Sequence, residues 1–289
     1  MVKVTMSKEK RILITGAAGR IGRLLSKSLK NRYTIRAVDI VPVEDDFEFI
    51  QTDITDFEAT NKIIDGVDTI IHLAAILPPQ SEIDRKKTIQ VNVEGTKNLL
   101  KASKRGGKNV HFIFTSSVAT YTTTENTSYP ISVNHKLGIT DIYSESKIIS
   151  EALIRNSKVP YTILRVSGIY APDSIELPET LQFQKDQKVE FVYLDDVITA
   201  LRASIDIEKA RNKIFNIAGG KSWRMTGQEF ITRMYDVLNL TVEPHYSPYN
   251  TYFSWYNTKI SNLILRYQQT SFNNFLEKVK EMGKRLGFL

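Results

Sequence analysis

The 289-residue sequence contains no cysteine. This absence excludes disulfide bonds, zinc sites built on thiolates and cysteine nucleophiles. The sequence also lacks an apolar run near the roughly 18 residues that cross a bilayer. Its longest such run, Ile70–Leu77, is interrupted by His72, and the basic Met1–Arg11 is not followed by an apolar segment as long as that of a signal peptide. We therefore expect a cytoplasmic protein without a signal peptide and without a membrane partner.

Strongly biased composition is absent as well. Hydrophobic residues make up 42% of the chain and charged residues 25%, values typical of globular proteins. These fractions exclude a mainly disordered chain and a fibrous repeat. The net charge is +7, but the basic residues are spread along the chain and form no dense run with aromatic residues. We expect a basic surface, which also suits an anionic small molecule, and no nucleic-acid partner.

Short apolar segments alternate with amphipathic ones in the first half of the chain, and this alternation predicts both strands and helices. The expected strands are Arg11–Thr15, Tyr33–Val38, Phe47–Gln51, Thr69–Leu73, Val110–Thr115 and Tyr161–Arg165. The expected helices are Ile21–Leu29, Phe57–Asp65, Lys86–Arg105, closed by Gly106-Gly107, and Asp141–Arg155, with an apolar face of Ile148, Ile149, Ala152 and Leu153. The pattern predicts an α/β fold with a doubly wound parallel sheet, whose ligands bind at the carboxyl ends of the strands.

The second half is less regular and richer in Pro, Tyr and Asn. Phe191–Val197 and Lys213–Ile217 are interpreted as returns to the sheet, whereas Thr226–Leu238 and Ser271–Arg285 predict helices. We expect a dinucleotide-binding domain over residues 1–168, with sheet returns near 189–217. A mainly substrate-binding cap is expected over residues 169–289.

A glycine-bearing turn separates the first expected strand from the first expected helix. Glycines at 16, 19 and 22 allow a tight turn and close approach to a pyrophosphate at the helix N-terminus, although a purely structural turn would look the same. Asp39 ends the second strand, where a carboxylate can bind ribose hydroxyls; because no basic residue follows, it favours NAD over NADP. An ordinary strand-end aspartate is the alternative.

Two later segments carry further candidate groups. Asp53 could meet an adenine amino group, while Thr55 or Asp56 could cap the following helix. Tyr143 and Lys147 are four residues apart and so share a helix face, where an ammonium favours phenolate over phenol. Such a tyrosine can act as a general acid/base, and Ser116 or Ser117 could bind the reacting oxygen. A surface pair is the alternative interpretation.

With these motifs in order, the sequence resembles the extended short-chain dehydrogenase/reductase family, in its NAD-dependent epimerase/dehydratase group of the nucleotide-sugar 4-epimerase type. The matching segments are TGAAGRIG at 15–22, Asp39, DIT at 53–55, HLAA at 72–75, NVEGT at 92–96, FIFTSS at 112–117, YSESK at 143–147, LR at 164–165, FVYLDDV at 191–197, NTK at 257–259 and TSF at 270–272. The resemblance covers essentially the whole chain.

The resemblance implies a Rossmann domain that holds NAD and a smaller C-terminal substrate domain. Tyr143 would be the catalytic acid/base, Lys147 would lower its pKa and bind ribose, and Ser117 would orient the substrate oxygen. The implied cofactor-binding residues are Gly16, Gly19, Arg20, Ile21, Gly22, Asp39, Asp53, Ile54, Leu73, Ala74, Ala75, Asn92, Thr115, Tyr143 and Lys147. No metal is implied, and His72 and His111 are expected in the core. The family often dimerises through two helices, here Lys86–Arg105 and Asp141–Arg155.

The sequence departs from the family's pattern at two positions. Nucleotide-sugar epimerases usually carry an arginine that meets the substrate diphosphate where this chain has Val189, and an asparagine where it has Gly168. Lys185, Lys188 or Arg224 could compensate. The acidic pair that sugar-nucleotide 4,6-dehydratases use for elimination is absent after Ser117, which disfavours that reaction.

The sequence therefore predicts an NAD-dependent epimerase or oxidoreductase that acts on a carbinol carbon of a sugar or sugar nucleotide. Two alternatives stay open. One is a dehydrogenase or reductase of a smaller non-nucleotide substrate. The other is a non-catalytic regulator that senses a dinucleotide on the same fold. The aromatic stretch Tyr246–Tyr256 could stack on a sugar ring or pack within the cap.

Overall fold

The computed structural model describes residues 10–105, 109–122, 128–175 and 179–287 of the chain. The chain forms two compact units. Unit 1 consists of Met1–Thr115, Asp141–Ile163 and Ser204–Lys213, and unit 2 of Ser116–Thr140, Leu164–Ala203 and Ile214–Leu289. The predicted division at residue 168 assigns cofactor binding to one domain and substrate binding to the other, and it stays a prediction.

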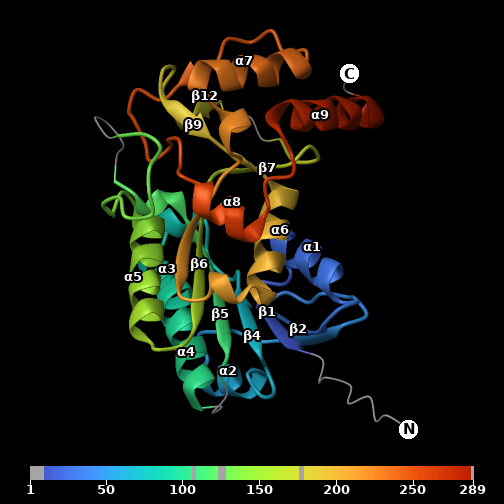
Figure 1. The fold of residues 1–289 in the computed structure, drawn as a ribbon, viewed down its shortest axis with the longest axis vertical. Helices are drawn as coiled ribbons and strands as arrows, with labels where there is room; N and C mark the ends of the chain where they lie inside the picture. The colour runs from blue at the N-terminus through green and yellow to red at the C-terminus, as the bar shows by residue number, and fades with distance from the viewer. Residues whose placement is uncertain (1–9, 106–108, 123–127, 176–178, 288–289) are drawn as a thin grey trace. The chain divides into compact units, whose positions relative to one another are not determined.

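A seven-stranded sheet contains the strands predicted in the first half of the chain (Figure 1). Its spatial order is β11 (Lys213–Ile217), β6 (Tyr161–Val166), β5 (His111–Ser117), β4 (Thr69–His72), β1 (Arg11–Thr15), β2 (Thr34–Asp39) and β3 (Glu48–Gln51). β1 pairs in parallel with both β2 and β4, and β2–β3 and β4–β5 are parallel too. The doubly wound parallel fold predicted from the sequence is thus confirmed.

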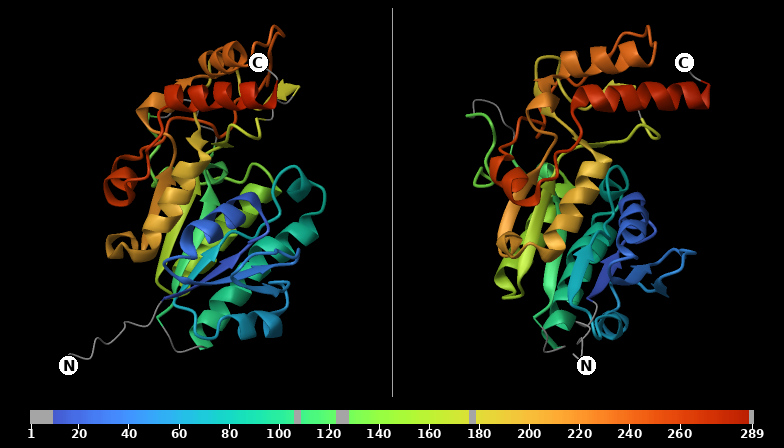
Figure 2. Two further views of the ribbon diagram at one scale, coloured as in Figure 1. Left: turned by 90° about the vertical axis from the view of Figure 1, so that its right-hand side faces the viewer. Right: turned by 45° about the vertical axis from the view of Figure 1, so that its right-hand side comes forward.

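The helices of unit 1 follow the expected alternation. They are α1 (Arg20–Leu29), α2 (Phe57–Ile63), α3 (Arg85–Ile89), α4 (Gly95–Arg105) and α5 (Ile142–Asn156). Figures 1 and 2 show α1 on one face of the sheet and α3, α4 and α5 on the other. Because both faces are covered, Ile12, Leu13 and Ile14 of β1 have no exposed surface.

The order of the strands fixes where a ligand can bind. From β1 the chain runs to β2 on one side, and β4 lies on the other side of β1. Thr15 at the end of β1 is in register with His72 at the end of β4. In sheets of this kind ligands bind beyond the carboxyl ends of the strands where the strand order reverses.

The expected long helix Lys86–Arg105 is interrupted. α3 and α4 are separated by a π-helical segment, η2 (Gln90–Glu94). π-helical segments are rare, and those that occur are often found at functional sites. This one contains Asn92, one of the predicted cofactor residues. The expected closure at Gly106-Gly107 lies outside the described residues.

Helix α5 is amphipathic in an unusual sense, because its polar side is the buried one. The buried residues are Ser144, Ser146, Lys147, Ser150, Glu151 and Ile154. The predicted apolar face is not buried: Ile148, Ile149 and Leu153 are half-buried and Ala152 is exposed. The apolar face of α5 is therefore left available at the surface of unit 1.

The remaining elements lie mostly in unit 2. They are β7 (Ile169–Tyr170), β8 (Thr180–Leu181), β9 (Lys188–Glu190), β10 (Val192–Tyr193), β12 (Arg224–Thr226), β13 (His245–Tyr246), α6 (Leu194–Asp206), α7 (Gly227–Val237), α8 (Lys259–Leu265) and α9 (Phe272–Leu286). β7 pairs with β10, β9 with β12, and β8 with β13. No helix among the described residues is long and apolar enough to cross a bilayer.

One predicted return to the sheet is wrong. Within Phe191–Val197, only β10 is a strand, it pairs with β7 in a separate two-stranded sheet, and α6 begins at Leu194. The apolar run continues as buried Leu194, Val197 and Leu201, which is helical spacing. The other predicted return, Lys213–Ile217, is confirmed as β11.

Candidate active site

The glycine turn is a compact structure against the segment that follows β4. Gly16 has φ of +73°, and a Cβ there would lie 2.6 Å from the amide nitrogen of Ala74. A Cβ on Gly22 would collide with the carbonyl oxygen of Gly16. The turn therefore requires glycine at both positions, and it leads through Gly19 into Arg20 and Ile21, the first two residues of α1.

Asp39, the last residue of β2, binds the glycine turn. One carboxylate oxygen accepts a hydrogen bond from the amide of Ala18 at 2.9 Å, and the other accepts one from the amide of Val41 at 3.0 Å. The amide of Ala17 also donates to the carbonyl of Val38. The predicted ribose-binding carboxylate is thus fixed beside the predicted pyrophosphate turn.

Asp53 and Ile54 follow β3. Asp53 is exposed, and its carboxylate accepts from the amide of Thr55 at 2.9 Å. Ile54 is buried, at 5% exposure. The cap of α2 is Asp56, whose side chain accepts from the amide of Ala59. Asp53 is therefore not needed as the cap and stays a candidate for a ligand.

The segment Leu73–Ala75 continues β4 and is held by β1. The amide of Leu73 donates to the carbonyl of Thr15 at 3.1 Å. His72 is buried, with ring nitrogens 2.7 Å from the hydroxyl of Thr15 and 2.9 Å from that of Thr96. Burial, helped by the charge of Lys147, lowers the pKa of His72 to about 3, so this ring is neutral. The predicted core role of His72 is confirmed.

Asn92 connects this segment to α5. Its side-chain oxygen accepts from the amide of Ile76 at 2.7 Å, and its side-chain nitrogen donates to the carbonyl of Ile76 and to the hydroxyl of Ser146, both at 3.0 Å. The contacts of Asn92 thus hold the loop after β4 against the helix that carries Tyr143. Among the described residues, Asn92 therefore contacts the loop and α5 and stabilises their packing.

Tyr143 and Lys147 lie in the first two turns of α5, as predicted. The helix begins with a capping box, in which the side chain of Asp141 accepts from the amide of Ser144 and the side chain of Ser144 accepts from the amide of Asp141. The Lys147 ammonium lies 5.6 Å from the centre of the Tyr143 ring. It donates to the carbonyl of Thr115 at 2.9 Å.

The ammonium of Lys147 is buried, with 4% of the residue exposed. It lies 4.7 Å from the centre of the Phe114 ring, a cation–π contact. Burial lowers the pKa of Lys147 to about 8, although the nearby Glu151 raises it. A buried cation next to a phenol favours phenolate, which is the requirement for a tyrosine that exchanges protons near neutral pH.

Thr115 and Ser117 are at the carboxyl end of β5. The hydroxyl of Thr115 is buried and has no hydrogen-bond partner among the residues that the structure describes. Ser117 belongs to unit 2, where its hydroxyl accepts from the amide of Ala119 at 3.1 Å. The structure therefore brings Tyr143, Lys147 and Thr115 together in unit 1 and describes Ser117 separately.

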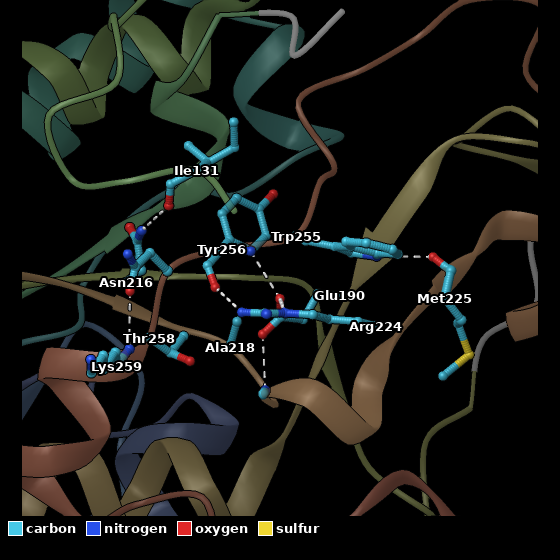
Figure 3. Close-up of polar contacts among 12 residues, drawn as sticks. Ile131, Glu190, Asn216, Ala218, Arg224, Met225, Trp255, Tyr256, Thr258 and Lys259 are labelled. Atoms are coloured by element: carbon cyan, nitrogen blue, oxygen red, sulfur yellow. Dashed lines mark hydrogen bonds and ion pairs between the residues drawn. The ribbon is translucent and has the colours of Figure 1, made fainter. Parts of the chain in front are cut away.

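Unit 2 contains a buried ion pair that fixes β9, β12 and the segment before α8 (Figure 3). Glu190 has no exposed surface, and its carboxylate accepts from Nε of Arg224 and the amide of Tyr256, both at 2.8 Å, and from the amide of Gly220 at 2.9 Å. Burial raises the pKa of Glu190 to about 7, whereas Arg224 and the amides lower it. Arg224 also donates to the carbonyl of Tyr256. Its guanidinium is therefore already bound within unit 2.

The two departures from the family's pattern both lie in unit 2, Val189 in its core and Gly168 against the buried ring of Phe191. Val189 is fully buried in β9, opposite Met225 of β12. A Cβ on Gly168 would lie 2.6 Å from the ring of Phe191, so an asparagine there would displace that ring. Lys188 lies 4.3 Å from the ring centre of Tyr129 and 5.5 Å from that of Trp255.

The sequence did not indicate Glu82, which contacts the predicted catalytic helix. Glu82 ends a short turn, η1 (Gln80–Glu82), and its carboxylate accepts from the amides of Ile142 and Tyr143. Nearby, Arg85 binds Glu145 of α5 through two hydrogen bonds. The partners are 60 residues apart, so local sequence patterns carry no signal for these contacts.

Comparison with known proteins identifies related sequences. The NAD dependent epimerase/dehydratase family matches residues 12–218. The 3 beta-hydroxysteroid dehydrogenase/Delta 5-->4-isomerase of Mycobacterium tuberculosis is 32% identical over 155 residues, which cover 50% of this chain and 42% of the relative. The match thus spans less than half of that relative. UDP-N-acetyl-alpha-D-glucosaminuronate decarboxylase of Bacillus cytotoxicus is 28% identical over 243 residues, covering 72% of this chain and 75% of the relative.

Solved structures share the fold over nearly the whole chain. A short-chain dehydrogenase/reductase superfamily protein from Agrobacterium tumefaciens, with bound NAD, has a TM-score of 0.82 at 20% identity, covering 96% of this chain and 98% of that one. UDP-glucose 4-epimerase of Thermotoga maritima, solved with UDP-glucose, has a TM-score of 0.81 at 21% identity, covering 96% and 99%. At such identities the likeness concerns the fold.

Proposed function

Because the chain belongs to the NAD-dependent epimerase/dehydratase family, of the extended short-chain dehydrogenase/reductase type, we propose that it oxidises or epimerises a carbinol carbon with Tyr143 as acid/base. The observation that carries the proposal is the buried Lys147 ammonium, one helical turn after Tyr143 and bound to the end of β5. A buried cation is costly to a fold. Beside the Tyr143 phenol, the buried ammonium can stabilise the phenolate that the reaction needs.

The described residues fit the family's cofactor, NAD. The glycine turn has no room for a side chain at Gly16 or Gly22, Asp39 presents a carboxylate beside that turn, and the buried Thr115 hydroxyl is without a partner among the described residues. NAD supplies a carbon that accepts hydride from the substrate, or returns it. The residues that we propose to hold it are Gly16, Gly19, Arg20, Ile21, Gly22, Asp39, Asp53, Ile54, Leu73, Ala74, Ala75, Asn92, Thr115, Tyr143 and Lys147.

The chain's own residues would handle the proton. In the oxidising direction, the Tyr143 phenolate takes the proton of the substrate hydroxyl while the carbinol carbon loses hydride and a carbonyl forms. Lys147 stabilises the phenolate, and the Ser117 hydroxyl donates to the substrate oxygen. If the carbonyl product stays and is reduced again on its other face, the net reaction is epimerisation; if it leaves, the net reaction is dehydrogenation.

A sugar or sugar nucleotide is the leading substrate class. It is supported by the Bacillus cytotoxicus relative, whose name places it on a UDP-linked uronate and of which the chain covers 75%. A second candidate is a non-nucleotide alcohol. It is favoured by Val189, which is buried, and by Arg224, whose guanidinium is bound to Glu190, because neither offers a free cation to a diphosphate.

We further propose a homodimer that uses helix α5. The half-buried Ile148, Ile149 and Leu153 form an apolar face on the surface of unit 1. Burying such a face against its own copy in a second chain is the simplest symmetric arrangement. The interrupted helix α3–η2–α4 is the second element that we expect at this interface.

The proposed reaction is tested by incubating the purified protein with UDP-, GDP- and dTDP-sugars, free sugars, uronates, hydroxysteroids and small alcohols, with and without NAD. Net NADH formation would identify a dehydrogenase. An isomeric product without net NADH would identify an epimerase. Turnover of hydroxysteroids or alcohols alone would replace the leading substrate class by the second. No turnover of any compound would contradict the proposed function.

A further inference from the structure

We propose that Glu82 is a positioning residue, which holds Tyr143 in place by binding the first turn of α5 from outside the helix. This inference rests on the proposed role of Tyr143. The Glu82 carboxylate accepts from the amide of Ile142 at 2.9 Å and from the amide of Tyr143 at 3.1 Å. The backbone nitrogen of the proposed acid/base is therefore itself bound to Glu82.

The four amides at the start of α5 that lack a backbone acceptor in the helix are all bound by side chains. A helix leaves its first four amides, counted from the N-cap, without backbone partners inside the helix. Glu82 binds those of Ile142 and Tyr143, the Asp141 side chain binds that of Ser144 at 2.6 Å, and the Ser144 hydroxyl accepts from that of Asp141 at 3.1 Å. Asp141 is local to the helix, whereas Glu82 is 60 residues away from it. Glu82 thus binds the backbone of this turn to another part of unit 1, and Arg85 adds a second contact through the side chain of Glu145.

Glu82 is itself held firmly. The hydroxyl of Ser81 donates to its carboxylate at 2.7 Å, and the carbonyl of buried Ser81 accepts from the hydroxyl of Thr88 at 2.9 Å. Burial raises the pKa of Glu82, but hydrogen bonds from Ser81 and the two amides lower it below its usual value, so the group is ionised at neutral pH. Arg85, three residues later, binds Glu145 at 2.6 Å and 3.1 Å.

The same loop leads back to the proposed cofactor residues. Leu73–Ala75 precede it, and the Asn92 side chain binds both the amide and the carbonyl of Ile76. The Asn92 side chain also donates to Ser146, whose hydroxyl donates to the carbonyl of Tyr143 at 2.7 Å. Residues 76–85 thus contact α5 through Asn92 at one end and through Glu82 and Arg85 at the other. A shift of this loop would move Tyr143.

The charge of Glu82 also acts on the phenol. The N-terminus of a helix carries a partial positive charge that favours a nearby anion. Glu82 adds a second negative charge to that end of α5, beside the Asp141 carboxylate, so we expect it to make the Tyr143 phenolate less favourable than Asp141 alone would. Removing the charge should lower the pKa of Tyr143, and the loss of positioning should appear separately as a lower kcat, which a cap that only stabilises the helix would leave unchanged.

The test compares Glu82→Gln and Glu82→Ala with Glu229→Gln. Glu229 is the matched control, because it also caps a helix, binding the amide of Thr226 at the start of α7 in unit 2. The primary readout is the titration of Tyr143 by NMR of ring-labelled tyrosine, with the signal assigned through Tyr143→Phe. This measurement requires no substrate, and each variant is first shown to be folded by its circular dichroism spectrum and cooperative thermal unfolding.

We expect both Glu82 variants to shift the Tyr143 titration to lower pH by roughly half a unit and to lower kcat roughly 5- to 20-fold, with Km for NAD within about twofold of the wild type. Glu229→Gln should change neither. An unchanged Tyr143 titration or an unchanged kcat in both folded Glu82 variants would overturn the inference, even if their melting temperatures fell. If the titration shifts but the wild type turns over no substrate, the proposed function fails while the role of Glu82 toward Tyr143 holds.

Discussion

Lys147 is the residue on which the proposed chemistry depends most, because a buried ammonium is easily deprotonated. Its pKa is lowered to about 8 by burial, against an ordinary value of 10.5. The unfolded chain therefore binds this proton more tightly, so this group favours folding more as pH rises from about 8 to 10.5. Activity should follow the opposite course, because the Tyr143 phenolate loses its neighbouring cation when Lys147 loses its proton.

The residue-scale prediction concerns the alkaline limb of the pH–rate profile. In the wild type, kcat for oxidation should fall above about pH 8. In Lys147→Arg the limb should disappear below pH 10, because a guanidinium keeps its charge, even if the maximal rate is lower. The profile is measured under saturating NAD, with Lys97→Arg, an exposed lysine paired with Glu94, as the control. An unchanged limb in Lys147→Arg would mean that another group titrates there.

Sequence patterns identify only part of the site at this scale. The spacing of Tyr143 and Lys147 predicts a shared helix face, and the glycines predict the turn, because both are local features. The burial of Lys147 against the ring of Phe114 and the contact of Glu82 with the amide of Tyr143 depend on tertiary packing. No local sequence pattern therefore indicates them.

At the scale of elements, the buried pair of Glu190 and Arg224 connects three segments of unit 2. Glu190 on β9 binds Arg224 of β12, Tyr256 before α8 and Gly220 before the turn η5 (Lys221–Trp223). Removing one member of a buried pair leaves the other without its partner, which costs more than losing the pair's attraction alone. The pair therefore matters more to unit 2 than an exposed ion pair would.

We expect Glu190→Ala to lower the free energy of unfolding by about 3 kcal/mol, because three donors lose their acceptor. The matched control is Glu208→Ala, which breaks an exposed pair with Arg211 in which the Glu208 side chain is 83% exposed. That variant should change stability by less than about 0.5 kcal/mol. Urea unfolding measures both. Equal effects of the two substitutions would show that the buried pair has no special weight.

Elements with a single clear period are predictable, and those with mixed signals are not. The strand Arg11–Thr15 is built on the apolar run Ile12–Ile14, and α7 follows Thr226, where the predicted helix begins. The run Phe191–Val197 begins as a strand and ends as a helix, and its strand part pairs with β7 only because the chain folds β7 beside it. Pairing partners of so short a strand are set by the tertiary fold.

At the scale of the whole molecule, the apolar face of α5 is the strongest argument for self-association. The polar side of this helix is used inside unit 1, where Lys147 and Ser150 are buried. The apolar side is therefore the surface that the proposed homodimer would bury.

We expect the protein to elute as a dimer at micromolar concentration and Ile149→Asp to convert it to a monomer, because a charge in an apolar interface is poorly tolerated. The control is Leu263→Asp on α8, a residue of unit 2 that is 71% exposed. It should leave the dimer intact. Size-exclusion chromatography with light scattering gives the masses. A monomeric wild type, or a dimer in both variants, would contradict the proposed interface.

The proposed reaction requires Tyr143 to move the proton during NAD-dependent oxidation of a carbinol. The most direct measurement is kcat of Tyr143→Phe on the substrate that the panel identifies, together with NADH binding followed by fluorescence. We expect kcat to fall about 100- to 10,000-fold while the affinity for NADH changes less than about threefold. A Tyr143→Phe variant that binds NADH and retains the wild-type kcat would contradict it.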